Sequence, residues 1–288
     1  MRCLVIGADG QLGRSLQTTA PAGTEVVAPA RALCDLTNSD HIERWLSDIR
    51  PEIVFNAAAY TAVDAAESDE ATAELVNAES VGRLAEAVKD RDIRLVHIST
   101  DFVFDGETNK PYCPDDAPNP INVYGRTKLK GEQAILRSGA DSLIVRTAWV
   151  YAVRGKNFVN TMLRLMRERD EIGVVADQIG TPTYARNLAR VLWTLAAQRA
   201  YGCYHFTDSG VASWYDFAVA IEEEALATGL LENVARIVPI ATSDYPTPAR
   251  RPRFSVLDKS KTWAATRDTG QHWRSALREM IRGMNRDD

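Results

Sequence analysis

The chain has 288 residues, of which 45% are hydrophobic and 25% charged, and its formal net charge is −5. This composition is typical of a folded globular protein and excludes fibrous, disordered and membrane-spanning classes. A mildly acidic chain without a basic run is a poor nucleic-acid binder. Its four scattered cysteines predict neither a disulfide framework nor a zinc site, and no signal peptide is apparent after Met1. We therefore expect a cytoplasmic protein without nucleic-acid or membrane partners.

The first half of the chain alternates short apolar runs with helical patterns. Buried strands are expected at Cys3–Ile6, Glu25–Ala28, Ile53–Asn56, Arg94–Ser99 and Ser142–Thr147. The clearest helices between them are Ser39–Ile49, Ala71–Lys89 and Tyr124–Arg137. This alternation predicts an α/β protein with a Rossmann-like, doubly wound parallel sheet.

After Thr147 the alternation becomes looser. Helices are expected at Asn157–Arg169, Ala185–Gln198, Ser213–Ala227 and Trp273–Met284, and short strands at Ile172–Val175, Tyr204–Phe206 and Arg236–Pro239. We expect residues 1–150 to form the sheet domain and residues 151–288 mainly a smaller C-terminal lobe. Within the second half, about residues 177–205 are expected to return to the sheet domain.

A glycine-rich turn directly follows the first strand and opens the first helix. Its glycines, Gly7, Gly10 and Gly13, have the spacing G-x-x-G-x-x-G, with Gln11 and Leu12 between the last two. Glycines there allow a tight turn, a close approach to a pyrophosphate and packing of the helix on the strand. At this place in a βαβ unit the pattern predicts a dinucleotide site formed by residues 7–13.

The end of the second strand indicates which dinucleotide is preferred. It reads Ala28-Pro29-Ala30-Arg31, so the carboxylate that would hold both ribose hydroxyls of NAD is missing. Arg31 could pair with the 2′-phosphate of NADPH, although a solvated surface arginine is the open alternative. Residues 1–150 are thus expected to bind NADPH, with NADH possible, and Asp35 and Leu36 are expected near the adenine.

Small residues close the third strand in the segment Asn56-Ala57-Ala58-Ala59-Tyr60-Thr61. At the carboxyl end of a parallel strand they would let a flat ligand lie against the backbone. An ordinary buried strand end explains the alanines equally well. We include Ala58, Ala59, Tyr60 and Thr61 among the expected cofactor contacts.

A hydroxyl, a phenol and an amine complete the candidate site. Thr100 ends the fourth strand, and Tyr124 and Lys128 are four residues apart, which places them on one face of a helix. A nearby ammonium would lower the phenol pKa from about 10 and suit Tyr124 to general acid chemistry. Thr100 could hydrogen-bond a substrate carbonyl, and Lys128 could also hold the nicotinamide ribose. The alternative is an exposed tyrosine and a solvated lysine.

Further blocks extend along nearly the whole chain: residues 56–64 (NAAAYTAVD), 99–106 (STDFVFDG), 122–132 (NVYGRTKLKGE), 146–151 (RTAWVY), 157–165 (NFVNTMLRL), 177–183 (DQIGTPT) and 245–253 (YPTPARRPR). With the glycine turn and the Y-x-x-x-K pair, the chain resembles the extended short-chain dehydrogenase/reductase superfamily. Within it, the chain is most similar to the dTDP-4-dehydrorhamnose reductases.

The resemblance implies reduction of the 4-keto group of dTDP-4-dehydro-β-L-rhamnose, the last step in making dTDP-L-rhamnose. It implies Tyr124 as proton donor, Lys128 as its partner and cofactor ligand, and Thr100 at the substrate oxygen. The expected substrate contacts are Thr100, Asp101, Trp149, Asn157 and Arg251. Trp149 could instead be a core residue. Arg251 lies in a proline-stiffened, arginine-rich loop suited to a diphosphate, or to a solvated basic turn. The assembly is expected to be a monomer or homodimer.

Two departures and two rival functions accompany the resemblance. Ser15 and Arg186 stand where some members carry glutamates for a magnesium-bridged dimer, so a Mg²⁺ site is not supported. Phe254 stands where asparagine is usual. A dehydratase would carry Asp-Glu where this chain has Asp101-Phe102, and phenylalanine cannot move a proton. The other rivals are an epimerase and a regulatory, non-catalytic relative.

Overall fold

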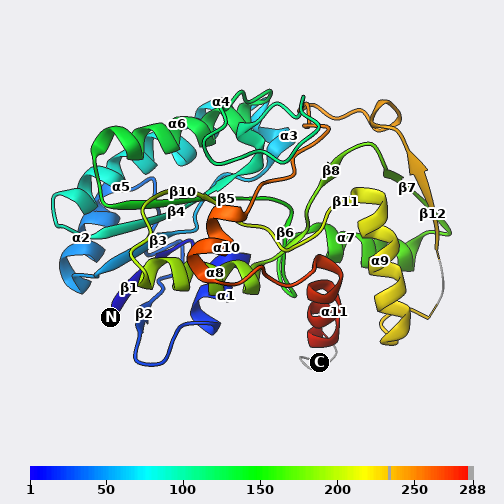
Figure 1. Cartoon of the computed structure of the whole chain (residues 1–288). Helices are drawn as coiled ribbons and strands as arrows, with labels where there is room; N and C mark the ends of the chain where they lie inside the picture. The colour runs from blue at the N-terminus through cyan, green and yellow to red at the C-terminus, as the bar shows by residue number, and fades with distance from the viewer. Residues whose placement is uncertain (233–234, 285–288) are drawn as a thin grey trace.

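The protein, described here by a computed structural model, is built on a six-stranded parallel sheet (Figure 1). The structure describes residues 1–232 and 235–284; residues 233–234 and 285–288, which fall in the expected C-terminal lobe, lie outside the described residues. The strand order is β10-β5-β4-β3-β1-β2. The strands are β1 (Arg2–Ile6), β2 (Glu25–Val27), β3 (Ile53–Asn56), β4 (Arg94–Thr100), β5 (Ser142–Thr147) and β10 (Gly202–His205).

Helices cover both faces of this sheet. One face packs on α1 (Gln11–Thr18) and α8 (Ala185–Ala197), and the other on α2 (Ser39–Ile49), α5 (Ser80–Lys89) and α6 (Val123–Ser138). Strands buried from both sides explain the continuous apolar runs in the sequence, such as Cys3–Ile6, whose side chains are wholly buried. The predicted α/β class with a doubly wound parallel sheet is confirmed.

The strand order reverses at β1. From β1 the chain goes to β2 on one side, and it then returns to β3 on the other side of β1. Loops after β1 and β3 therefore separate at the carboxyl edge of the sheet and leave a crevice there. The glycine turn follows β1 and the alanine segment follows β3, so the fold places both at this crevice.

A second body lies beside the sheet and has its own core (Figure 1). Side chains from α7 (Phe158–Glu168), α9 (Trp214–Ala227) and α11 (Trp273–Met284) pack there with β7 (Glu171–Val175), which pairs with β12 (Arg236–Ile240). Two small ribbons join the bodies: β6 (Val150–Tyr151) with β9 (Thr183–Tyr184), and β8 (Ile179–Gly180) with β11 (Ala212–Ser213). The helix α10 (Ser260–Thr266), which the sequence did not predict, packs near α8 and β10.

The long helix expected at residues 71–89 is interrupted. The chain forms α3 (Val63–Ala66) and α4 (Glu70–Glu74), then a π-helical turn η1 (Leu75–Glu79), and only then α5. Inside η1, the buried Asn77 donates to the Tyr60 carbonyl and the Thr127 hydroxyl, both at 3.1 Å. Long-range hydrogen bonds of this kind favour a local bulge over a regular α-helical ladder. The short 3₁₀ turns are η2 (Asp101–Val103) and η3 (Thr242–Asp244).

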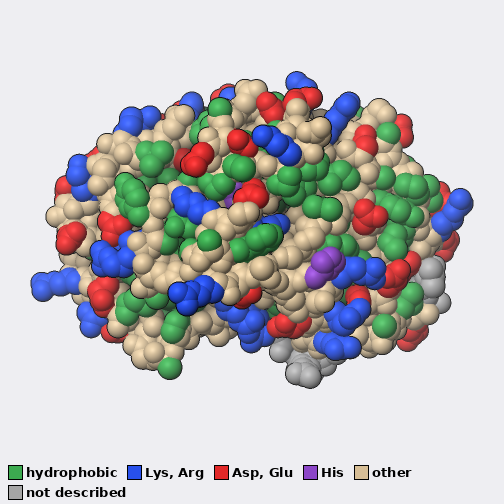
Figure 2. Space-filling view, in the orientation of Figure 1, with side chains coloured by type: hydrophobic (Ala, Val, Ile, Leu, Met, Phe, Trp, Pro, Cys, Tyr) green, Lys and Arg blue, Asp and Glu red, His purple; other side chains and the backbone are tan. Residues whose placement is uncertain are grey.

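Figure 2 shows acidic and basic side chains interspersed on the face in view. Within the described ranges, no helix is long and apolar enough to cross a membrane.

Candidate active site

The crevice at the carboxyl edge of the sheet opens into a cavity of about 970 Å³ between the sheet and the second body. A second cavity of about 430 Å³ continues it past the glycine turn, and the two share Gly10 and the alanine segment. Predicted residues that line the first are Gly10, Gln11, Leu12, Ala58, Ala59, Thr61, Thr100, Asp101, Tyr124, Lys128, Trp149 and Arg251. Those that line the second include Gly7, Arg31, Asp35, Leu36 and Tyr60.

The glycine turn is shaped by contacts that a side chain would prevent. Gly7 has φ +83°, and a Cβ placed on Gly13 would lie 2.2 Å from the Gly7 carbonyl oxygen. The turn therefore folds directly onto the start of α1, where Gly10 is the N-cap and no side chain among the described residues caps the helix. Uncapped N–H groups at a helix N-terminus are suited to a phosphate. This cradle fits the pyrophosphate of a dinucleotide.

Arg31 and Asp35 face each other at the mouth of the second cavity. The Arg31 Nε lies 3.4 Å from an Asp35 carboxylate oxygen, and 77% of the Arg31 side chain is exposed. Burial would raise the pKa of Asp35, but hydrogen bonds from Thr37 and the Arg31 charge outweigh it and lower that pKa. Asp35 is thus an ionised carboxylate that partly neutralises the positive charge of Arg31. Whether Arg31 contacts a 2′-phosphate stays a prediction.

Tyr124 is carried into the cavity by the start of α6. Asn122 caps this helix by accepting a 2.8 Å hydrogen bond from the Gly125 N–H. A Cβ on Gly125 would lie 2.1 Å from the Phe102 carbonyl oxygen, so glycine allows α6 to approach the end of β4 closely. The ring of Tyr124 packs edge-on against Phe102, with 5.6 Å between centroids. This packing fixes the phenol beside Thr100.

The electrostatics of Tyr124 differ from the expectation. Burial raises its pKa to about 12; a hydrogen bond with Thr100 lowers it and the charge of Asp101 raises it. The expected lowering by Lys128 is wrong, because the lysine amine is bonded elsewhere, to the Ile98 carbonyl and toward His97. Tyr124 is consequently a protonated phenol at neutral pH, ready to donate.

Thr100 and Asp101 form a buried pair next to the phenol. The Thr100 hydroxyl donates to Asp101 Oδ1 at 3.0 Å and accepts from the Phe102 N–H at 3.2 Å. Burial raises the pKa of Asp101 to about 6, against hydrogen bonds from Ser255 and Thr100. The carboxyl group therefore titrates near neutral pH beside the candidate proton donor.

Lys128 lies one helical turn after Tyr124 and is 1% exposed. Its Nζ donates to the Ile98 carbonyl at 2.7 Å and lies 3.4 Å from His97 Nε2. Burial lowers the pKa of Lys128 to about 8, while the charge of Glu132 raises it. Glu132 itself is tied to Arg146 in a buried ion pair of 2.7 Å.

The wall of the cavity opposite the sheet carries two stacked indoles. Trp149, at the unusual φ of +48°, stacks on Trp214 with 3.5 Å between centroids and 9° between planes. Because both rings line the cavity, they offer an apolar surface to a ligand.

Arg251 and Asn157 are engaged within the protein. The Arg251 guanidinium holds the Asp64 carboxylate with bonds of 2.7 and 3.0 Å. Arg251 still borders the cavity. Asn157 lies elsewhere: it caps α7 and donates to Gln11 Oε1 at 2.9 Å. The structure brings Arg251 to the site and places Asn157 against the Gln11 side chain, outside the residues that line the cavity.

Ser15 and Arg186, which stand where some family members carry glutamates for Mg²⁺, make contacts within the protein. Ser15 donates to the Gln11 carbonyl, and Arg186 pairs with Glu279 at 3.5 Å. Within the described residues there is no cluster of three or more histidine, cysteine or acidic side chains that could hold a metal ion.

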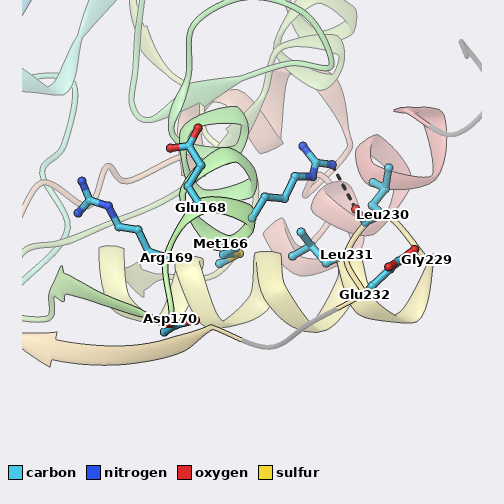
Figure 3. Close-up of a pocket in the computed structure, with 9 residues that line it drawn as sticks. Met166, Glu168, Arg169, Asp170, Gly229, Leu230, Leu231 and Glu232 are labelled. Atoms are coloured by element: carbon cyan, nitrogen blue, oxygen red, sulfur yellow. Dashed lines mark hydrogen bonds between the residues drawn. The ribbon is translucent and has the colours of Figure 1, made fainter.

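A separate cavity of about 480 Å³ lies between the end of α7 and the segment after α9 (Figure 3). Arg167 bridges it by donating to the Leu230 carbonyl at 3.1 Å. Its lining is residues 166–170 and 229–232, which holds none of the predicted site residues.

Sequence reasoning missed some residues of the main cavity. Trp214 and Arg154 line it, and the buried Ser99 hydroxyl has no hydrogen-bond partner among the described residues. Trp214 lies within the capping box formed by Ser213 and Asp216, a pattern that indicates a helix start and nothing about a ligand. His97 could have been noticed, because a histidine within an apolar strand three residues before Thr100 is unusual.

Comparison with known proteins agrees with this geometry. A family model described as RmlD substrate binding domain matches residues 1–286. A dTDP-4-dehydrorhamnose reductase of Burkholderia thailandensis is 48% identical over 268 residues, covering 89% of this chain and 90% of the relative. The chain belongs to the dTDP-4-dehydrorhamnose reductase family. The resemblance found in the sequence is confirmed.

Solved structures of the family match the fold closely. A dTDP-4-dehydrorhamnose reductase from Clostridium acetobutylicum superposes with a TM-score of 0.93 at 38% identity, covering 99% of this chain and all of the other. The enzyme from Bacillus anthracis, solved in complex with NADP, gives a TM-score of 0.92 at 35% identity and covers 98% of this chain and 99% of the other.

Proposed function

We propose that this chain reduces the 4-keto group of dTDP-4-dehydro-β-L-rhamnose to give dTDP-L-rhamnose, with NADPH as the reductant. Membership of the reductase family supports this activity, and a relative of 35% identity is described in complex with NADP. The observation that carries the proposal is the adjacency of the Thr100 hydroxyl and the Tyr124 phenol in the cavity that the glycine turn also lines.

Each reacting group has a role that its environment supports. Tyr124, protonated at neutral pH, would donate its proton to the carbonyl oxygen as that oxygen gains negative charge. Thr100 would turn its one hydroxyl proton from Asp101 to the same oxygen and hold that oxygen in place. Lys128, buried one helical turn after Tyr124, would bind the cofactor ribose as an ammonium. Bound NADPH would supply the hydride.

The remaining predicted residues would bind the two ligands. The cradle of Gly7, Gly10 and Gly13 fits a pyrophosphate, and the segment 58–61 borders the same space. The stacked pair of Trp149 and Trp214 would take the apolar face of the deoxysugar. Arg251 would bind the diphosphate after exchanging part of its contact with Asp64.

The direct test is an assay of the whole chain with dTDP-4-dehydrorhamnose and NADPH. The expected result is oxidation of one NADPH per keto-sugar consumed and formation of dTDP-L-rhamnose, identified by chromatography and NMR. NADPH binding without oxidation would indicate the non-catalytic alternative. Conversion of the sugar without net NADPH consumption would indicate epimerisation, and either result overturns the proposal.

A further inference from the structure

A chain of hydrogen-bonding groups runs across two neighbouring strands to Lys128. Asn56 on β3 and His97 on β4 are partners in the parallel register, and both side chains are 0% exposed. The Ala58 N–H donates to Asn56 Oδ1 at 3.2 Å, and Asn56 Nδ2 lies 3.1 Å from His97 Nδ1. His97 Nε2 lies 3.4 Å from Lys128 Nζ.

The donors and acceptors in this row of groups fix which atom donates in each hydrogen bond. Because Asn56 Oδ1 accepts from Ala58, the amide atom facing His97 is the NH₂ group, which can only donate. His97 Nδ1 must then accept, so the proton of a neutral imidazole lies on Nε2. The ring is neutral because burial holds its pKa well below the ordinary value, and an ammonium at Lys128 would lower that pKa further.

The Nε2–H group of His97 therefore points at the lysine nitrogen. An ammonium carries three N–H groups and no lone pair, whereas a neutral amine has one lone pair that can accept. Lys128 Nζ uses an N–H toward the Ile98 carbonyl at 2.7 Å, which leaves its lone pair for His97. The contact is satisfied by the neutral amine and unsatisfied by the ammonium.

We propose that His97 is a positioning residue for Lys128: with Asn56 behind it, His97 donates a hydrogen bond to the lysine amine and favours the neutral form. The link to the reaction rests on the proposed function, in which Lys128 acts as a cation. To become an ammonium, Lys128 requires the imidazole proton to move to Nδ1, against the Asn56 NH₂ group, or the amide to turn away from Ala58. Either change loses a buried hydrogen bond.

Other charged and titratable groups lie near Lys128, and their influence on its pKa does not depend on which atom donates a hydrogen bond. Tyr124 precedes it by one turn of α6, and Asp101 lines the same cavity. Glu132 follows by one turn, raises the lysine pKa by its charge, and is neutralised by Arg146. Burial lowers the same pKa, to about 8 overall. These effects depend on distance and solvent, whereas the His97 contact depends on which ring nitrogen carries the proton.

The first experiment measures that proton in the unmutated protein without added cofactor. The chain contains four histidines, so ¹⁵N-labelled imidazole rings give a small set of signals whose couplings distinguish the two tautomers. His97→Gln assigns the signal, and the exposed His272 serves as an internal reference. The expected result is an Nε2–H tautomer of His97 at pH 9, above the Lys128 pKa of about 8, where the neutral amine predominates. An Nδ1–H tautomer or an imidazolium at this pH overturns the inference.

The second experiment measures the Lys128 pKa with ¹⁵Nζ-labelled lysine, assigned by Lys128→Met. Asn56→Leu removes the group that fixes the tautomer and should raise the lysine pKa by about one unit, the equivalent of one buried hydrogen bond. Asn56→Asp should raise it further, with His97 switched to Nδ1–H. If the lysine pKa rises in Asn56→Asp but not in Asn56→Leu, the added charge controls that pKa and the His97 tautomer does not, which contradicts the inference. If Asn56→Leu does not fold, the tautomer measurement still decides.

The pH profile of kcat/KM separates this inference from the proposed function, because it reports groups of the free enzyme. If Lys128 acts as a cation, a higher lysine pKa moves the alkaline limit of activity in Asn56→Leu to higher pH by the same amount. An unmoved limit together with a raised lysine pKa contradicts the catalytic role of the ammonium and leaves the hydrogen bond from His97 standing.

Discussion

The two walls of the main cavity are constructed differently. On the sheet side, Thr100 and Lys128 are 5% and 1% exposed, and their polar atoms are bonded to neighbouring groups of the same buried layer. On the opposite side, Trp149, Trp214 and Arg251 are partly exposed and come from segments far apart in the chain. Ring stacking and one ion pair with Asp64 hold them.

This difference follows the demands of the chemistry. A proton donor must be held within a fraction of an ångström of the atom it serves, and packing against buried side chains gives the partly buried Tyr124 that rigidity. Ligand-binding groups need contact area and can adjust on binding. We therefore expect changes to the sheet wall to reduce turnover, and changes to the opposite wall to reduce affinity.

The largest effect is expected for Tyr124→Phe, which keeps the ring packed on Phe102 and removes the donor. Turnover should fall by about 10²–10⁴-fold, while NADPH affinity stays within about twofold. Steady-state kinetics and fluorescence titration of NADPH measure the two quantities. Near-normal turnover would show that Tyr124 is not the proton donor. It would also contradict the expectation that changes to the sheet wall act on turnover.

Gly13→Ala should follow in size. A Cβ there lies 2.2 Å from the Gly7 carbonyl oxygen, so the turn must open and its cradle is lost. We expect NADPH affinity to fall by at least about tenfold and the melting temperature to fall by several degrees. Gly283→Ala is the matched control, because its Cβ meets only Val153 at 3.8 Å. Equal behaviour of the two variants would contradict a rigid cradle.

Arg251→Ala should act on the substrate alone. Losing one charge-assisted contact to a diphosphate should raise the KM for the sugar nucleotide by about tenfold, with kcat changed little. Asp64→Asn is the comparison, since it releases the guanidinium without removing it. A substrate KM that Arg251→Ala leaves unchanged would show that this loop does not bind the diphosphate.

The smallest effect is expected for Arg31→Ala. Its side chain is 77% exposed and shares its charge with Asp35, so solvent and that carboxylate weaken any bond to a 2′-phosphate. The preference for NADPH over NADH should fall by only about threefold to tenfold, measured as the ratio of kcat/KM values. An enzyme that prefers NADH from the outset would leave Arg31 without the predicted role.

Local patterns in the sequence were sufficient for most of the sheet domain. Ile53–Asn56, Ser142–Thr147 and Ser39–Ile49 were predicted with the bounds that the structure has. Each is a continuous apolar strand or an amphipathic helix with a capping residue, here Asn38, so neighbouring residues decide it. The glycine turn and the Tyr124–Lys128 spacing are equally local.

What the sequence could not provide depends on distant contacts. The π-turn at Leu75–Glu79 accompanies hydrogen bonds of Asn77 to residues 17 and 50 positions away. The stacking of Trp149 on Trp214 joins two elements by the folding of the second body. The raised pKa of Tyr124 comes from burial, which spacing alone does not determine. Residues on the wall opposite the sheet were accordingly predicted less completely.

The position of β10 limits how this protein can be divided. This strand, which comes after α7, β7 and α8 in the chain, pairs with β5 and forms the edge of the sheet. Trp193 on α8, 3% exposed, donates to the Leu16 carbonyl at 3.1 Å and joins α8 to α1. A fragment ending at residue 150 would expose β5 as an apolar edge and uncover α1, a state prone to aggregate. Recombination that exchanged the second body between relatives would therefore need cuts on both sides of the segment from α8 to β10, because the two bodies are interleaved in sequence.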